Sequence, residues 1–311
     1  MNNTKNNYSK LSDATKNALL GNLAEAGALD AAKELLEAGA DPNRSRIDIN
    51  AARPLQIAFK SGNVAMVKLL MEHGATTSEN FHLSQIDDCI KENRNYRELI
   101  NAVLDHQPDK VLTSKAIIGC SKNGDNEFLG HLLTKEWTHL LTDKAMGNAS
   151  SRGYTNIVET LREQGFVISI SDIVNAACNG HFETANKLLN LTEFDQDQLD
   201  NAMLNTYRRT HDYDKTDLFL KAGANPNGLQ DKLFELCKDN EDTAFMDRLI
   251  MERNFRPIRN NLWPLDNTDD SHFEQHITQT IKKADLHEKL RNNLTRPKPT
   301  STKSKDKSWK I

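Results

Sequence analysis

The sequence predicts an all-α solenoid, in which about eight divergent helix pairs stack side by side and a further helical segment caps the C-terminal end. Two observations carry this prediction. The phrase LLEAGADPN (35–43) returns almost unchanged as FLKAGANPN (219–227). Glycines twelve residues apart, with an apolar helical run between them, recur as Gly27 and Gly39, Gly62 and Gly74, and Gly153 and Gly165. Because self-similarity at a regular spacing is the signature of repeat architectures, we expect a stack of similar units.

Each repeat is expected to hold two short helices. The first carries small residues before its glycine, such as Ala24 and Ala176, and the second carries a leucine stripe, as at Leu35 and Leu36. A glycine that ends a helix adopts the left-handed backbone conformation at little cost. The proline of the repeated phrase then prevents the helix from continuing. A pair this small cannot bury its apolar faces alone, so it must stack on its neighbours.

The same template places the ends of successive helix pairs along the chain. The expected ends lie near Gly39, Gly74, Gln107, Glu136, Gly165, Thr192, Gly223 and Arg253. The two copies of the phrase are then six repeats apart, at about 31 residues a repeat. We therefore expect a polar N-terminal lead over residues 1–16 and a repeat array over residues 17–254.

The repeat pattern stops there, and residues 255–294 are expected to form the helical cap that a solenoid needs at its end. The apolar positions Phe273, Ile277 and Ile281 share one helical face, whereas Leu286 and Leu290 lie off that face. This pattern fits either one bent helix or two short ones.

Composition narrows the class of partner. The chain has 40 basic and 44 acidic residues and a net charge of −4, which gives no general attraction to nucleic acid or to an anionic membrane. The polar N-terminus lacks the apolar stretch of a secretory signal, and no segment is apolar enough to cross a membrane. Four widely spaced cysteines without a CxxC pair suit a reducing compartment. We expect a soluble monomer.

The sequence offers no catalytic residue, metal ligand set or cofactor motif. His272 and His276 lie four residues apart, but Phe273 follows the first histidine where a zinc protease needs glutamate. We interpret both as solvated helix histidines, and His211, beside Asp212, as part of a polar turn. The cysteines of the first helices, Cys120, Cys178 and Cys237, occupy alanine positions and are expected to pack rather than react. An enzyme with a site in the degenerate middle repeats or in the cap remains the alternative.

The repeats resemble the ankyrin-repeat family. The segments GALDAAKELLEAGADPN (27–43) and PLQIAFKSGNVAMVKLLMEHGA (54–75) are similar to its helix pair and the cap that follows. The family's Thr-Pro-Leu-His signature appears only as Arg53-Pro54-Leu55-Gln56. The connection between the first two pairs is long enough for the family's β-hairpin, whereas later connections are shorter.

This resemblance implies a protein-binding scaffold whose concave groove is lined by hairpin tips and by the exposed side of the first helices. Interface-type residues near the end of the seventh first helix are expected to face solvent as well. The resulting candidate partner-binding residues are Arg44, Arg46, Arg53, Gln56, Phe59, Lys60, Asn148, Arg152, Tyr207, Arg208, Arg209 and Tyr213.

Residues 295–311 are rich in Pro, Ser, Thr and Lys and are expected to be disordered. This tail could be a solvated terminus or a basic arm that tethers the chain to an anionic membrane or nucleic acid. It also resembles the C-terminal type IV secretion signals of intracellular bacterial effectors. That resemblance implies an adaptor or inhibitor that is exported to the host cytoplasm, where it binds a host protein; otherwise the chain is cytoplasmic.

Overall fold

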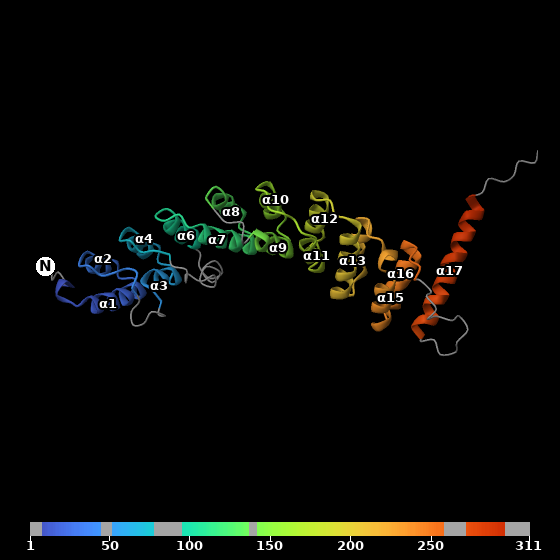
Figure 1. Ribbon diagram of the computed structural model, residues 1–311, viewed down its shortest axis with the longest axis horizontal. Helices are drawn as coiled ribbons and strands as arrows, with labels where there is room; N and C mark the ends of the chain where they lie inside the picture. Colours follow the sequence, from blue (N-terminus) through green and yellow to red (C-terminus); the bar gives the residue numbers. More distant parts are fainter. Residues whose placement is uncertain (1–7, 45–51, 78–94, 137–141, 258–271, 296–311) are drawn as a thin grey trace, which may run out of the picture. The chain divides into compact units, whose positions relative to one another are not determined.

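The computed structural model describes residues 8–44, 52–77, 95–136, 142–257 and 272–295 (Figure 1). Over these residues the secondary structure is helical, without a β-strand. The chain divides into two compact units, Met1–Glu193 (unit 1) and Phe194–Ile311 (unit 2). The predicted hairpin between the first two pairs and the predicted disordered tail lie outside the described residues.

Unit 1 consists of two layers of helices (Figure 1). The first helices contact one another in one layer, and the second helices contact one another in the other layer. The first helices are α1 (Asp13–Ala26), α3 (Pro54–Lys60), α7 (Lys110–Asn123), α9 (Thr142–Arg152) and α11 (Ile170–Cys178). The second helices are α2 (Leu29–Glu37), α4 (Val64–Glu72), α6 (Tyr96–Leu104), α8 (Asn126–Leu133), α10 (Thr155–Glu163) and α12 (Phe182–Leu191). A 3₁₀ turn, Tyr8–Lys10, precedes them.

Unit 2 continues with two more helix pairs and a terminal helix. The pairs are α13 (Gln196–Thr210) with α14 (Tyr213–Lys221), and α15 (Gln230–Asp239) with α16 (Thr243–Arg253), separated by the 3₁₀ turn Pro226–Leu229. The terminal helix α17 (His272–Thr295) packs against α16. It is one helix, with Phe273, Ile277 and Ile281 buried, whereas Leu286 and Leu290 are 56% and 52% exposed.

The described helices confirm the predicted fold class. Eight second helices end within three residues of the eight predicted positions, from Glu37 of α2 to Arg253 of α16. Each apolar stripe is buried, including Leu35, Leu70 and Leu188. The glycine and leucine spacing therefore placed the repeats correctly, even where the later copies had lost the glycine.

The repeated phrase ends its helix in the same way in both copies. Gly39 has φ +92° and Gly223 has φ +106°, a left-handed conformation that glycine adopts without the steric penalty of a Cβ atom. The next backbone N–H donates back into the helix, from Ala40 to Leu35 O at 3.1 Å and from Ala224 to Phe219 O at 2.9 Å. These bonds satisfy carbonyl groups that a helix end leaves free.

The final asparagine of the phrase joins its helix pair to the next one. Asn43 Oδ1 accepts the Thr76 backbone N–H at 2.8 Å, and Asn227 Oδ1 accepts the Arg256 backbone N–H at 2.9 Å. Asn43 Nδ2 also donates to Gly74 O at 2.9 Å. The sequence showed that this asparagine recurs, and the structure shows that it is an inter-repeat hydrogen-bonding residue.

The polar residues in α14 are accommodated without distorting the helix. Thr216 is fully buried at a position that is apolar in better-conserved repeats. Its hydroxyl donates to the Asp212 carbonyl oxygen at 2.8 Å, and the helix runs unbroken from Tyr213 to Lys221. A buried polar group that has a partner costs little, so the helix keeps its regular geometry at this position.

Glu241 occupies a position where other repeats have glycine. Its φ is +51°, whereas the residues that follow α1 and α7, Gly27 and Gly124, have φ +69° and +82°. We predict that Glu241→Gly raises the free energy of unfolding by about 0.5–1 kcal/mol, because glycine removes the left-handed strain. Urea denaturation followed by circular dichroism measures this change. Glu241→Ala is the control, since it removes the charge and keeps the strain; an equal gain from both variants would refute the backbone explanation.

Candidate functional site

The candidate residues that flank the connection between the first two pairs are partly accessible. Arg44 and Lys60 are exposed, and Arg53 is half-buried where α3 begins. The Arg44 Nε atom lies 3.6 Å from a carboxylate oxygen of Asp41. Arg46 lies outside the described residues. These side chains offer positive charge beside the connection between the first two pairs.

Two other candidates near this connection do not face solvent, so the prediction that they line a groove is wrong. Phe59 is fully buried and Gln56 is 8% exposed. Phe59 lies one helical turn after Leu55, on the face of α3 that packs against α1 and α4. The Gln56 Oε1 atom accepts the Arg53 backbone N–H at 2.8 Å, which satisfies the start of α3. The helical phase relative to Leu55 is the signal that would have identified Phe59 as a core residue.

Asn148 and Arg152 lie together in a surface depression of about 600 Å³ in unit 1. We call this depression the α9–α11 site; its lining residues are Asn148, Ser151, Arg152, Tyr154, Asn179 and His181. They come from the C-terminal ends of α9 and α11 and from the turns that follow these helices. Arg152 is exposed, and Tyr154 and His181 are half-buried. Sequence reasoning therefore found two of the six lining residues.

Hydrogen bonds hold the frame of the α9–α11 site. Asn179 Nδ2 donates to the Ser151 carbonyl oxygen at 2.9 Å, which ties the end of α11 to α9. The Ser151 hydroxyl donates to the Asn148 carbonyl oxygen at 3.1 Å, and Asn148 Nδ2 donates to Lys144 O at 2.8 Å. Because these contacts fix the backbone, a ligand would meet a largely preformed surface.

In unit 2 the expected exposure of Tyr207 and Tyr213 is wrong. Tyr207 is fully buried and Tyr213 is 7% exposed. The Tyr207 ring lies 3.9 Å from the Phe245 ring, between centroids, and its hydroxyl donates to Asp242 Oδ2 at 2.8 Å. Burial, followed by the neighbouring Cys237 and Asp242, raises the pKa of Tyr207 above its usual value. The Tyr207 hydroxyl therefore forms a hydrogen bond within the fold, as is usual for a buried tyrosine.

Tyr213 is held by the next helix pair. Its hydroxyl donates to Glu252 Oε2 at 3.1 Å, and the Arg248 guanidinium carbon lies 3.6 Å from the centre of its ring. Of this candidate group only Arg208 and Arg209 are exposed, in the last turn of α13.

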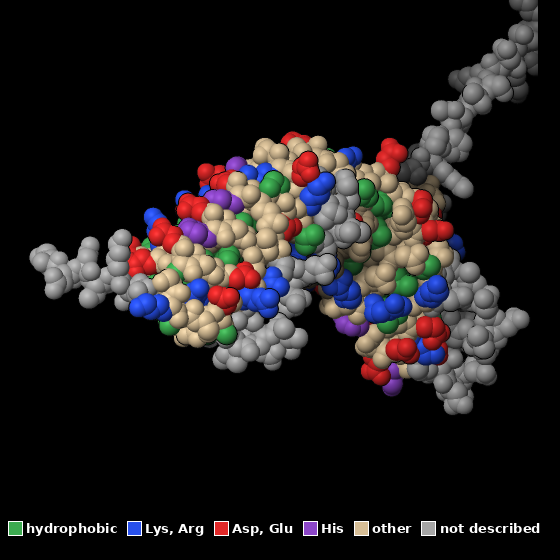
Figure 2. Space-filling view, turned by 60° about the vertical axis from the view of Figure 1, so that its left-hand side comes forward, with side chains coloured by type: hydrophobic (Ala, Val, Ile, Leu, Met, Phe, Trp, Pro, Cys, Tyr) green, Lys and Arg blue, Asp and Glu red, His purple; other side chains and the backbone are tan. Residues whose placement is uncertain are grey.

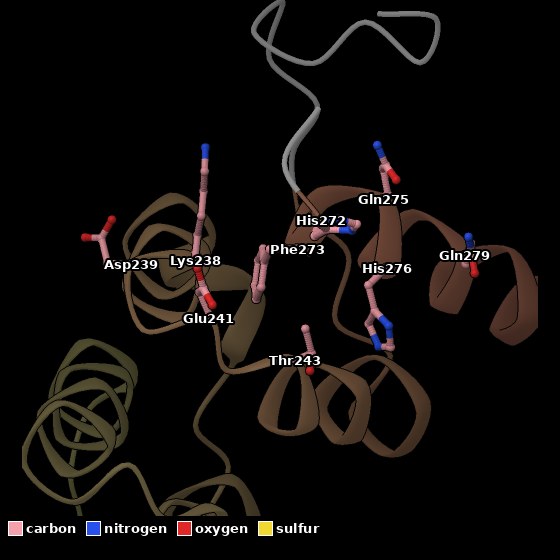
Figure 3. Close-up of a pocket in the computed structure, with 9 residues that line it drawn as sticks. All are labelled: Lys238, Asp239, Glu241, Thr243, His272, Phe273, Gln275, His276 and Gln279. Carbon is pink, nitrogen blue, oxygen red and sulfur yellow. The ribbon is translucent and has the colours of Figure 1, made fainter. Parts of the chain in front are cut away.

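A second depression, of about 790 Å³, lies in unit 2 where α17 crosses the end of α15 (Figure 3). Figure 3 shows Lys238 and Asp239 on one side and His272, Gln275, His276 and Gln279 on the other. Several of its charges are already paired within the fold. Lys238 Nζ lies 2.7 Å from Glu274 Oε1, which raises the pKa of Lys238, and His276 Nε2 lies 2.9 Å from Asp247 Oδ2.

The first-helix cysteines are only partly as expected. Cys120 and Cys237 are buried, and burial raises the pKa of each thiol to about 12. At neutral pH both are therefore protonated and unsuited to nucleophilic attack. Cys178 is half-buried rather than part of the core. Among the described residues, no three His, Cys, Asp or Glu side chains form a metal-binding group.

The charged side chains give no single-sign area on the face that Figure 2 shows. Lys and Arg side chains are interspersed there with Asp and Glu, and hydrophobic side chains form scattered patches. In the part of the chain that the structure describes, no helix meets the length and hydropathy needed to cross a membrane.

Comparison with known proteins shows what the first repeats of the chain are similar to. Residues 22–71, from the last part of α1 into α4, match the family described as "Ankyrin repeats (many copies)". No curated protein matches the chain. Among solved structures, the human ASB11 ankyrin repeat domain is similar at 21% identity, over 66% of this chain and 84% of that chain, with a TM-score of 0.33. The family match and the repeated helix pairs support an ankyrin-repeat protein with an all-α solenoid fold.

Proposed function

We propose that this chain is a scaffold that binds another protein on the surface formed by the first helices of unit 1 and the turns that follow them. The observation that carries the proposal is the α9–α11 site, where Asn148 and Arg152 meet on a preformed polar surface. The ankyrin resemblance also predicts both residues as partner-binding residues. Ankyrin repeats generally serve protein interaction, and a rigid array binds with a small ordering cost.

A finer part of the proposal concerns the partner. The resemblance of the chain to secreted ankyrin effectors supports a host protein as the partner, and an adaptor or inhibitory role in which a surface is occupied without covalent chemistry. Arg208 and Arg209, which are exposed in unit 2, and Arg44 and Lys60, which are exposed near the first connection, are further candidate contacts.

Affinity capture from a eukaryotic cell lysate tests this function. The double variant Asn148→Ala/Arg152→Ala is expected to recover the partner at least about tenfold less well than the wild type, because a contact to an exposed cation at the centre of an interface is worth about 1.4 kcal/mol or more. The purified partner should then form a complex of defined stoichiometry with the wild type. Arg162→Ala, which removes an exposed arginine from α10, is the control and should bind normally. Equal recovery by all three proteins would reject the α9–α11 site as the binding surface.

A further inference from the structure

The turns between the helices of each pair stack on the preceding pair in unit 1. We define the turn residue as the one directly after the residue of positive φ that follows a first helix, which is a glycine in the described turns of unit 1 and His211 or Glu241 in unit 2. A Cβ atom placed on Gly27 would lie 2.9 Å from Asn63 Nδ2, and one placed on Gly124 would lie 2.9 Å from the Tyr154 ring. A Cβ atom placed on Gly153 would lie 2.5 Å from His181 Nδ1. The glycines are therefore needed for packing as well as for their left-handed conformation, because each one receives a side chain from the next pair.

At most of these turns the side chain also caps the second helix. The residues that accept a backbone N–H of the following helix are Asn63, Asp125, Asp212 and Asp242. An N-cap of this kind is worth about 1 kcal/mol. Tyr154 and His181 make no such bond, and neither does Ala28 in the first pair. Two consecutive turns thus carry large polar aromatic side chains where helix stability favours Asp or Asn, and both of these side chains line the α9–α11 site.

The unused hydrogen-bonding groups of the site are mainly donors. Within the described residues, the side chains of Arg152, Tyr154 and His181 have no hydrogen bond or ion pair, and no Asp or Glu is among the lining residues. One side-chain N–H of Asn148, one of Asn179 and the Ser151 hydroxyl already donate to backbone carbonyls. A guanidinium, a phenol and an imidazole remain, and a guanidinium binds a carboxylate with two parallel hydrogen bonds. The two asparagine Oδ1 atoms remain as acceptors for backbone N–H groups.

We infer that the α9–α11 site binds an acidic segment of the partner protein, with an Asp or Glu carboxylate on Arg152 and with Tyr154 and His181 as additional donors. This inference rests on the proposed function and adds the chemistry of the partner. The Tyr154 ring lies against Gly124 and the His181 ring lies against Gly153, each in the preceding pair. Both rings are therefore positioned before the partner binds.

Selection of peptides from a display library of random 12-residue peptides on the immobilised full chain tests the inference. The enriched peptides are expected to share an Asp or Glu at one position. Arg152→Gln should weaken their binding about tenfold, as expected for a charge-assisted hydrogen-bonded pair. Tyr154→Phe keeps the ring over Gly124 and removes only the hydroxyl group, and should weaken binding about fivefold. Fluorescence anisotropy with the selected peptides measures both changes.

Arg162→Gln is the matched control, because Arg162 is exposed and lies in the last turn of its helix, as Arg152 does. It should leave peptide binding unchanged. Enrichment of peptides that lack a shared acidic residue, or unchanged binding to Arg152→Gln, would overturn the inference and leave the proposed function standing. Failure to enrich any peptide, together with failure to capture any protein, would overturn both.

Discussion

Tyr207→Ala is expected to lower the free energy of unfolding by about 3–5 kcal/mol, the usual cost of truncating a fully buried aromatic side chain. Tyr207 is fully buried, its ring packs at a tilt against the Phe245 ring, and its hydroxyl donates to Asp242. The substitution removes the ring from the core of unit 2 and leaves a cavity between α13 and α16. Urea denaturation followed by circular dichroism measures the loss. Tyr207→Phe, which removes only the hydroxyl group, should cost about 0.5–1.5 kcal/mol.

The neighbouring arginines provide the control for this prediction. Arg208 and Arg209 are adjacent in sequence but exposed, so replacing either by alanine should change the free energy of unfolding by no more than about 0.5 kcal/mol. If Tyr207→Ala were as mild as Arg208→Ala, the buried position of the ring would be wrong. The contrast also affects binding studies, because replacing Tyr207 would destabilise unit 2, so a loss of binding by that variant would not report a lost contact. The role of this patch has to be tested on the two arginines alone.

The fold could be predicted because it depends on features that recur along the chain. A glycine after a helix, a proline beyond it and a leucine stripe before it each follow from backbone geometry or from burial. They are visible even when only some copies keep them; the second helix of the sixth pair ends at Leu191 without any glycine. The structure shows what the asparagine that ends both copies of the phrase does: its side-chain oxygen accepts a backbone N–H of the next repeat. That partner lies about 30 residues away, and no local pattern indicates it.

The candidate site was harder to predict because it depends on which side of a helix a residue occupies. Asn148 and Arg152 are four residues apart on α9, and their shared face could be inferred. The ankyrin resemblance predicts Phe59 on the groove and residue type predicts Tyr207 on the surface, although their helical phase places both in the core. Tyr154 and His181 were missed because each was read within its own repeat. Comparing the residue after each first-helix glycine across the repeats would have shown that Asp and Asn give way there to Tyr and His.

The second large effect is expected at Asp200, which supports the second copy of the repeated phrase. Asp200 is 5% exposed, and its Oδ1 atom accepts the Asn225 backbone N–H at 2.6 Å and a Gln196 side-chain N–H at 2.7 Å. Asp200→Ala leaves the part-buried Asn225 N–H without its acceptor. The free energy of unfolding should fall by about 1.5–3 kcal/mol, the range for hydrogen bonds to a charged group. Urea denaturation measures the loss.

The first copy of the phrase supplies the control for Asp200. There the same backbone N–H, that of Asp41, is accepted at 2.9 Å by Asn17 Oδ1 from the first helix of the pair. An asparagine is therefore sufficient for this role, and Asp200→Asn should cost less than about 1 kcal/mol because it keeps the acceptor and removes only the charge. If Asp200→Asn were as destabilising as Asp200→Ala, the carboxylate charge would be the essential feature, and the two copies of the phrase would be supported by different interactions. The expected near-equivalence of Asn and Asp at this position explains how the two copies differ in the supporting residue while both keep the same backbone hydrogen bond.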